Sequence, residues 1–334
     1  MRILFPASDW ASNIGNPFFT LGVKHAIETA VPKAEIIFTG SNPIMAMGLK
    51  GRAKRMALNY PAYMGDTDAI MFAGPMLDKN FGRIFGPALR AAKQKNIKVF
   101  LVSAGGIEYD DEEISHCRDV LTQYKPEILY TRDRETFGLY GDIIEKSFSG
   151  VCGAWFAPEY YPGYDTPELK PYITSVYDTR AEAPIEFLTA AIEGADILDM
   201  PAFPGKYKGR LSRILDRKEI FEAKGHRIIR SCHRPTNPNF TVFSKPNTFA
   251  SYTPFGYLNL YRNTTVTVTD RPHAAVATLA YGNPAYLTLR SNRVKLLAAA
   301  GVEYQHGKRL VADQPHLNSL KKGVVSFLGN ALGS

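Results

Sequence analysis

The sequence predicts an α/β protein made of two Rossmann-like domains that face each other across a cleft. Short β-rich runs alternate with helical stretches along most of the 334 residues, a pattern typical of parallel sheets covered by helices. A turn-rich stretch at 158–171 interrupts this alternation, which restarts after it. We therefore expect one domain over residues 1–160 and a second over residues 161–334, each long enough to bury its own core.

The first half is expected to form a sheet with helices between its strands. Its predicted strands, the last of them short, are 1–6, 34–40, 68–74, 97–105, 128–133 and 150–158. Helical patterns cover 17–31 and 85–96, and a further helix is expected over 135–140 with Asp133 as its cap.

The second half repeats the pattern. Its predicted strands are 172–178, 195–203, 226–232, 263–270 and 285–290. Its predicted helices are 183–195, 212–225, 273–282 and 320–333. The last of these helices is expected to close the chain by packing across a domain, with the possibility that it crosses back to the first one.

Composition excludes several classes of function. The formal charge is +8, but basic and acidic residues are mixed along the chain and no Lys/Arg tract stands out, so we expect anionic small molecules rather than nucleic acid as partners. No run of eighteen apolar residues predicts a transmembrane segment, and a cytoplasmic protein is expected. The three cysteines have no metal-ligand or disulfide spacing, so buried free thiols are expected and no metal or cofactor is predicted.

The best candidate site is the junction Asp270-Arg271-Pro272-His273, between a buried strand and a small-residue helix. Pro272 suits the first turn of a helix and places Asp270 or Arg271 near the N-cap. Ligands of open α/β sheets bind beyond the carboxyl ends of the strands. Arg271 offers a planar fork for phosphate or carboxylate, and His273 a proton that titrates near neutrality. The alternative is a capping ion pair between Asp270 and Arg271 beside a core histidine.

Three other stretches place candidate residues at the same edge of a sheet. Asn13, Gly15 and Asn16 lie in the first strand-to-helix turn, where a glycine allows close approach of a ligand. Arg132 follows a predicted strand directly, and a solvated Arg-Asp-Arg cap is the alternative there. His233 and Arg234 repeat the basic strand end, with an ordinary surface loop as the alternative.

The tyrosines of 158–164 suit either sugar stacking at a cleft mouth or a packed hinge. No nucleophile triad, phosphate-binding loop or paired-carboxylate motif accompanies these sites. The residues alone therefore predict a site for an anion without naming a reaction.

The stretch 266–302 resembles the C-terminal signature of the polysaccharide pyruvyl transferase family. Arg271-Pro272-His273 matches the family's Arg-x-His, Gly282-Asn283-Pro284 its Gly-x-Pro, and Arg293 or Lys295 the basic residue before the next helix. Weaker resemblances lie earlier, in NIGN at 13–16, MFAGPML at 71–77 and LYTRDRETFGLYG at 129–141. Asn16 in place of Asp, Thr136 in place of Ser and Pro272 in place of an apolar residue depart from the family pattern.

The resemblance implies a fold similar to that of type B glycosyltransferases, with an acceptor side in the first domain and a donor side in the second. It implies transfer of a pyruvyl group from phosphoenolpyruvate to a glycan or lipid-linked sugar as a cyclic ketal. On this basis His273 and Arg271 are the expected catalytic residues. The expected substrate-binding residues are Arg132, Arg234, His233, Asn13, Gly15, Asn16, Arg293 and Lys295.

Two other functions stay open at this point. One is a glycosyltransferase that uses a nucleotide sugar on the same architecture. The other is a degenerate, non-catalytic member of the family that binds a glycan. No interface pattern in the sequence predicts an oligomeric state.

Overall fold

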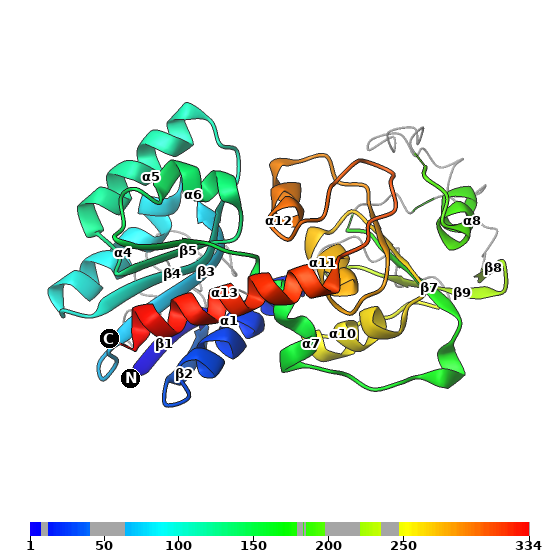
Figure 1. Cartoon of the computed structure of the whole chain (residues 1–334), viewed down its shortest axis with the longest axis horizontal. Helices are drawn as coiled ribbons and strands as arrows, with labels where there is room; N and C mark the ends of the chain where they lie inside the picture. The colour runs from blue at the N-terminus through cyan, green and yellow to red at the C-terminus, as the bar shows by residue number, and fades with distance from the viewer. Residues whose placement is uncertain are drawn as a thin grey trace, which may run out of the picture.

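The computed structural model contains two parallel sheets, each covered by helices (Figure 1). It describes residues 1–7, 13–40, 64–178, 183, 185–197, 221–234 and 247–333. The predicted α/β class with two Rossmann-like domains is confirmed by this architecture. The change from one sheet to the other falls between Ser149 and Tyr172.

The first sheet has the strand order β2-β1-β3-β4-β5-β6, and all of its pairs are parallel. Its strands are β1 (Arg2–Ala7), β2 (Glu35–Gly40), β3 (Ala69–Leu77), β4 (Lys98–Gly106), β5 (Ile128–Thr131) and β6 (Lys146–Ser149). Its helices are α1 (Asn16–Ala30), α4 (Phe81–Gln94), α5 (Asp111–Tyr124) and α6 (Arg134–Tyr140). Asp133 caps α6 as expected, because its Oδ1 accepts a hydrogen bond from Thr136 N at 2.7 Å.

The second sheet has the order β11-β10-β7-β9-β8, with only the edge strand β8 antiparallel. Its strands are β7 (Tyr172–Val176), β8 (Glu222–Ala223), β9 (His226–Ser231), β10 (Thr267–Thr269) and β11 (Ala285–Leu287). Its longer helices are α8 (Ile185–Glu193), α10 (Pro254–Asn263) and α11 (Pro272–Ala280). Arg271 is the N-cap of α11 and so is one of the two residues, Asp270 and Arg271, expected near that position.

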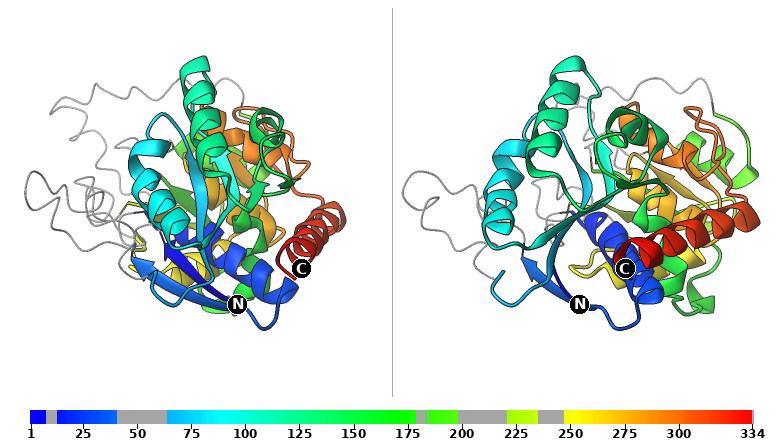
Figure 2. Two further views of the ribbon diagram at one scale, coloured as in Figure 1. Left: turned by 90° about the vertical axis from the view of Figure 1, so that its left-hand side faces the viewer. Right: turned by 60° about the vertical axis from the view of Figure 1, so that its left-hand side comes forward.

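The last helix, α13 (Gln314–Leu332), leaves the second half and lies along α1 and β6 of the first (Figures 1 and 2). One hydrophobic core includes Phe5 of β1, Ala275 of α11 and Leu328 of α13. Lys321 of α13 is 6% exposed and forms an ion pair with Glu159, which neutralises its charge inside this interface. The two halves therefore share buried apolar surface rather than a polar contact alone.

The predicted strand at 150–158 is wrong. The segment Gly153–Phe156 is a 3₁₀ helix followed by α7 (Ala157–Tyr160), and the last strand of this sheet is the earlier β6. The cause is close packing between backbones: a Cβ on Gly22 of α1 would lie 1.8 Å from the carbonyl oxygen of Gly153. The apolar residues of 150–158, which resemble a strand in sequence, pack against α1 instead of pairing with the sheet.

The predicted helix at 212–225 is wrong in its last residues, because 222–223 form β8 and the chain turns at 224–225 into β9. Its remainder lies outside the described residues, as do 198–203 of the predicted strand 195–203, whose first residues 195–197 are not in a strand. Helices α5 and α10 were not predicted. The helices predicted at 183–195, 273–282 and 320–333 correspond to α8, α11 and α13. The observed α11 starts one residue before the predicted start, and α13 starts six residues before it.

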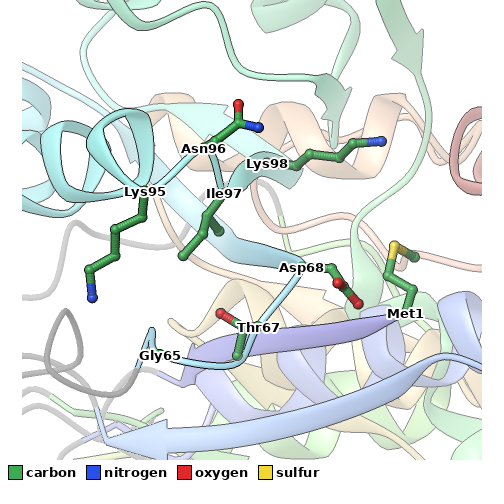
Figure 3. Close-up of a pocket in the computed structure, with 8 residues that line it drawn as sticks. All are labelled: Met1, Gly65, Thr67, Asp68, Lys95, Asn96, Ile97 and Lys98. Atoms are coloured by element: carbon green, nitrogen blue, oxygen red, sulfur yellow. The ribbon is translucent and has the colours of Figure 1, made fainter.

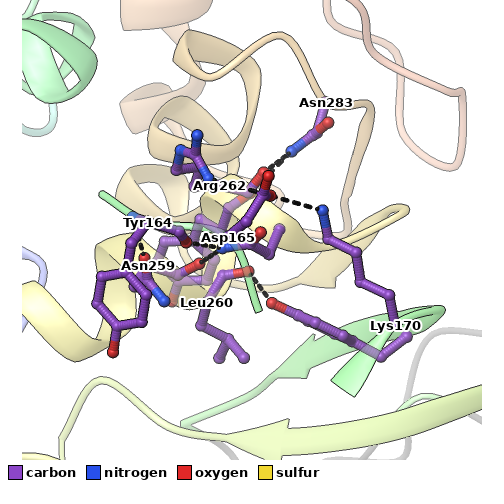
Figure 4. Close-up of polar contacts among 10 residues, drawn as sticks. Tyr164, Asp165, Lys170, Asn259, Leu260, Arg262 and Asn283 are labelled. Atoms are coloured by element: carbon purple, nitrogen blue, oxygen red, sulfur yellow. Dashed lines mark hydrogen bonds and ion pairs between the residues drawn. The ribbon is translucent and has the colours of Figure 1, made fainter. Parts of the chain in front are cut away.

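The stretch between the sheets is tied to α10 by hydrogen bonds and ion pairs (Figure 4). Tyr164 N donates to Asn259 Oδ1 at 2.9 Å. Asp165 lies 3.0 Å from Lys170 Nζ and 3.3 Å from Arg262 Nη1. These contacts hold the connection against the second half.

All three cysteines are free and buried, as expected. Among the described helices, none combines the length and the apolar character needed to cross a bilayer.

Candidate active site at the facing strand ends

The carboxyl ends of the two sheets meet at the first turn of the chain. Ile14 N donates to the carbonyl oxygen of His233 at 2.8 Å. A Cβ on Gly15 would lie 2.9 Å from His233 Nδ1 and 3.2 Å from His273 Cβ. Only a glycine fits here, since any larger side chain would push the two histidines away. The expected turn, His233 and His273 are therefore brought together from three distant parts of the chain.

The first turn of α1 covers both imidazoles with aromatic rings. The Phe18 ring meets His233 edge-on at 5.6 Å between centroids, and the Phe19 ring lies 5.2 Å from His273. Both phenylalanines are at most 1% exposed. The histidines consequently sit in a low-dielectric environment, which disfavours their charged forms.

Arg132 is buried at the end of β5, and its guanidinium is the group least compensated by the protein. The side chain is 2% exposed, yet Nε and Nη1 have no hydrogen-bond partner among the described residues. Gly105 at the end of β4 makes room for it, because a Cβ there would lie 2.3 Å from Arg132 Nε. A buried guanidinium without partners is costly unless an anion arrives to fill it.

Arg271 is balanced by a carboxylate that the sequence did not reveal. Asp178, two residues beyond β7, holds Oδ2 3.1 Å from Arg271 Nε and 3.6 Å from Arg234 Nε. Its Oδ1 accepts hydrogen bonds from His233 N at 2.6 Å and Arg234 N at 3.2 Å. Asp178 thus organises three strand ends at once, and Arg271 pairs with Asp178 rather than with Asp270, the partner in the alternative interpretation.

Asp270 lies beside this ion pair without sharing its role. Asp178 N donates to Asp270 Oδ1 at 3.3 Å. Burial, opposed by the charge of Arg271 and assisted by that of Asp178, raises the pKa of Asp270 to about 6.

Arg293 adds another guanidinium to the cluster. Its Nε is buried and has no hydrogen-bond partner among the described residues. Burial, then the positive charges of Arg132, Arg271 and Arg234, lower the pKa of Arg293 to about 10. At neutral pH it is still charged, so it adds to the positive charge of Arg132 and Arg271, of which Arg271 is paired with Asp178.

His273 is neutral in this setting. Burial, followed by the charges of Arg293 and Arg132, holds its pKa well below the ordinary value. Its Nε2 is buried and has no partner among the described residues. A neutral imidazole with a free nitrogen is suited to accept a proton rather than to donate one.

His233 is buried too, but its ring is already occupied. Nε2 lies 2.5 Å from Tyr261 Oη, and burial with the charge of Arg271 lowers the pKa of the imidazole. Its position supports Tyr261 and Gly15 more directly than it offers a free nitrogen.

The remaining expected residues lie around this centre rather than in it. Asn13 shapes the turn, because Gly15 N donates to its Oδ1 at 3.3 Å and Asn16 N to its carbonyl oxygen at 3.0 Å. Arg234 lies at the rim, with its side chain 45% exposed. Lys295 is not directed at the histidines: it pairs with Glu135 and lies 4.1 Å from the centroid of the Tyr109 ring.

Sequence reasoning missed Asp178, Tyr109 and Glu113. The 0% exposed Glu113 carboxylate accepts hydrogen bonds from Ile107 N, Glu108 N and Tyr109 N at 2.9–3.1 Å and so fixes the loop after β4. For Asp178 a signal existed, since it is the last residue of the predicted strand 172–178 and so lies at its carboxyl end. Glu113 and Tyr109 lie in a charged helix start that gives no such signal.

A shallow hollow of about 760 Å³ lies elsewhere, at the amino ends of β1, β3 and β4 (Figure 3). Its lining includes Thr67, Asp68 and Lys98. This edge is opposite to the one at which open α/β sheets bind ligands, and the histidine cluster is not part of it.

The model of a protein family covers most of the chain. The model described as polysaccharide pyruvyl transferase matches residues 13–292, which include the Gly15 turn, Arg132, His233 and His273. This chain belongs to the polysaccharide pyruvyl transferase family. As a member of that family it is a transferase of polysaccharide biosynthesis, and the resemblance found in the sequence is confirmed.

The comparison with curated proteins found no match. Among solved structures, MnaA of S. aureus in a co-structure with UDP has a TM-score of 0.52 at 12% identity, covering 99% of this chain and 91% of that one. UDP-GlcNAc 2-epimerase from Methanocaldococcus jannaschii, in complex with UDP-GlcNAc and UDP, has a TM-score of 0.52 at 12% identity, covering 100% and 98%. At such identity this pyruvyl transferase family member shares their fold alone.

Proposed function

We propose that the protein transfers a pyruvyl group from phosphoenolpyruvate to two hydroxyls of a glycan sugar, forming a cyclic ketal. The observation that carries the proposal is the set of guanidinium groups of Arg132, Arg271 and Arg293 beside the neutral His273. Phosphoenolpyruvate has a phosphate and a carboxylate on one small carbon frame. Both anions find planar, charge-assisted donors here.

The charge balance favours a division of labour among the arginines. The charge of Arg271 is partly neutralised by Asp178. Arg271 is therefore suited to the singly charged carboxylate of phosphoenolpyruvate. Arg132 and Arg293 have buried guanidinium nitrogens without partners, which suits the dianionic phosphate. Phosphate leaving as an anion is stabilised by the same groups in the transition state.

The protons that must move in this reaction assign His273 the role of general base. One sugar hydroxyl gives its proton to the neutral imidazole of His273 and bonds to the central carbon of phosphoenolpyruvate. The imidazolium formed in this way passes that proton to the methylene carbon, which becomes methyl, and His273 is neutral again. The bond from that carbon to the phosphate oxygen then breaks. The second hydroxyl bonds to the same carbon, and its proton leaves with phosphate. General base catalysis of this kind contributes typically ~10²–10⁴-fold.

The acceptor is proposed to enter from the first half, past the turn of Asn13, Gly15 and Asn16. This turn approaches both histidines, and its asparagines carry uncharged polar groups suited to sugar hydroxyls. We propose a glycan or a lipid-linked sugar as the acceptor. We also propose the cytoplasm as the compartment, because the proposed donor, phosphoenolpyruvate, is found there.

The test is turnover and donor binding in matched variants. For His273→Gln we expect kcat to fall ~10²–10⁴-fold while the Kd for phosphoenolpyruvate stays within about threefold, since the proton acceptor is lost and the arginines remain. For Arg271→Gln we expect the Kd to rise at least about tenfold, as for a charge-assisted pair. Calorimetric titration and release of inorganic phosphate with a glycan acceptor measure the two quantities.

The controls are His226→Gln and Arg227→Gln at the far end of β9, which should match the wild type. Wild-type rates in both site variants would contradict the assignment of the site. Calorimetric binding of UDP or GDP, without binding of phosphoenolpyruvate, would favour a nucleotide-sugar glycosyltransferase. Binding of glycan without turnover of any donor would favour a non-catalytic member.

A further inference from the structure

The segment that carries Arg293 is fastened to the opposite half of the molecule on both sides of that residue. Asn292 Nδ2 donates to the carbonyl oxygen of Glu108 at 2.8 Å. Lys295 Nζ forms an ion pair with Glu135 and lies over the Tyr109 ring at 4.1 Å. We call residues 292–295 the bracing turn.

The surface that receives the bracing turn is itself held rigidly. Tyr109 Oη donates to Asp133 Oδ2 at 3.2 Å and lies 3.1 Å from Thr136 Oγ1. The buried Glu113 carboxylate fixes the backbone around Tyr109 from the other side. Lys295 therefore contacts an aromatic face that the first half holds in place without it.

The charges of Arg293 and Arg132 explain why the bracing turn needs contacts that hold it in place. Arg293 comes from the second half and Arg132 from the first, and the charge of Arg132 is the strongest electrostatic influence on Arg293. The two guanidinium cations repel each other, so the segment that carries Arg293 tends to move away from Arg132. The shared core holds the two sheets together, but a local contact is needed to hold this segment in place before an anion binds.

We propose that Lys295 is a positioning residue that does not touch the donor: its contacts with Glu135 and Tyr109 hold the bracing turn on the first half and keep Arg293 beside Arg132, ready for one shared anion. The inference rests on the proposed function for the identity of that anion as the donor phosphate. It replaces the sequence-based expectation that Lys295 binds substrate.

The variant Lys295→Met keeps the length of the side chain and removes its charge. We expect the Kd of inorganic phosphate and of phosphoenolpyruvate to rise about tenfold, because a cation–π contact and a half-exposed ion pair together are worth about that factor. Most of the effect on turnover should appear as a higher KM for phosphoenolpyruvate, since bound phosphate itself draws Arg132 and Arg293 together. Calorimetry and initial rates measure both.

Two further variants separate positioning from ligand binding or general stability. Lys295→Arg keeps the pairing with Glu135 and the stacking on Tyr109, so it should restore wild-type Kd within about twofold. Lys146→Met is the matched control: Lys146 pairs with Glu127 at 3.0 Å, and its side-chain exposure of 36% is close to the 30% of Lys295. Lys146 also donates to the carbonyl oxygen of Ala331 at 3.3 Å, but these contacts lie at the amino ends of β5 and β6, opposite to the strand ends that form the site. Lys146→Met should bind phosphate as the wild type does.

The exchange Glu135→Lys with Lys295→Glu reverses the ion pair and loses the stacking on Tyr109. Its Kd for phosphate should lie between those of the wild type and Lys295→Met.

Several results would overturn the proposal. They are unchanged phosphate affinity in Lys295→Met, equal weakening in Lys295→Arg, equal weakening in Lys146→Met, or no phosphate binding by the wild type. The outcomes also distinguish the two proposals. If the Lys295 variants change phosphate affinity as expected but phosphoenolpyruvate yields no transfer, the proposed reaction is contradicted. The proposed role of Lys295 in positioning the bracing turn is then still supported.

Discussion

At the scale of single residues, the site contains two carboxylates in different states. Asp178 accepts two backbone hydrogen bonds and pairs with Arg271, so its charge is well compensated. Asp270 accepts a hydrogen bond from the backbone of Asp178, and burial raises its pKa to about 6. One carboxylate therefore organises the strand ends, whereas the other ionises within them at a cost to stability.

Asp270→Asn should make the protein more stable at neutral pH. The native carboxyl keeps its proton up to about pH 6, whereas the unfolded one loses it near pH ~4, so wild-type stability declines between those values. The variant lacks this penalty and should gain about 3 kcal/mol at pH 7, well above the native pKa, with no gain near pH 4. Urea unfolding at pH 4, 5, 6 and 7 measures the difference.

Asp165→Asn provides a control of opposite sign. Its hydrogen bond with Lys170 lowers the pKa of Asp165, so the wild-type carboxylate adds stability above the unfolded pKa and the variant should lose it there. A gain for Asp270→Asn that is equal at pH 4 and pH 7 would show that ionisation is not its cause.

At the scale of elements, the end of β4 is shaped to hold Arg132. The strand slips its register against β5 between Leu101 and Ala104, and Ser103 adopts a φ of 49°. This irregularity brings the backbone of Gly105 against the guanidinium of Arg132. The element thereby positions a charge without contributing one.

Gly105→Ala should weaken anion binding while every charge remains in place. The added Cβ would lie 2.3 Å from Arg132 Nε, so the guanidinium must move. We expect the Kd of phosphate, measured by calorimetry, to rise about tenfold, the cost of one misplaced charge-assisted contact.

The control is Gly138→Ala in the exposed part of α6, where a Cβ meets nothing within 4 Å. It should leave the Kd unchanged and stabilise the helix by up to about 1 kcal/mol. Wild-type affinity in Gly105→Ala would mean that Arg132 does not contact the anion.

At the scale of the whole molecule, α13 and the shared core make the halves depend on each other. Leu328 of α13 is fully buried in the core that also contains residues of α1 and α11. A site built between two halves needs such a core, because the facing strand ends keep their geometry only if the sheets keep theirs.

Leu328→Ala should destabilise both halves together, by about 2–5 kcal/mol. The free, buried Cys117 of the first half and Cys232 of the second report on each half separately. Thiol labelling followed by mass spectrometry should show both cysteines becoming reactive at the same, lower urea concentration. Separate midpoints for Cys117 and Cys232 would show that the halves unfold independently.

The sequence by itself determined the α/β class, most strands and the family. Hydrophobic runs are local signals, and a residue that follows a run is placed at a strand end whatever surrounds it. Arg132, His233 and Arg271 could be located in this way, and the Arg-x-His and Gly-x-Pro spacing named the family. The boundary between residues 160 and 161 stays a prediction.

Only the tertiary structure decided which strand ends meet and which charges are paired. The approach of Gly15 to His273, the ion pair of Asp178 with Arg271 and the contact of Lys295 with Tyr109 join residues far apart in the chain. The 3₁₀ turn at Gly153–Phe156 likewise depends on the backbone of α1. Burial and the distances between charges are set by packing, and packing depends on the whole fold, so no local pattern in the sequence contains them.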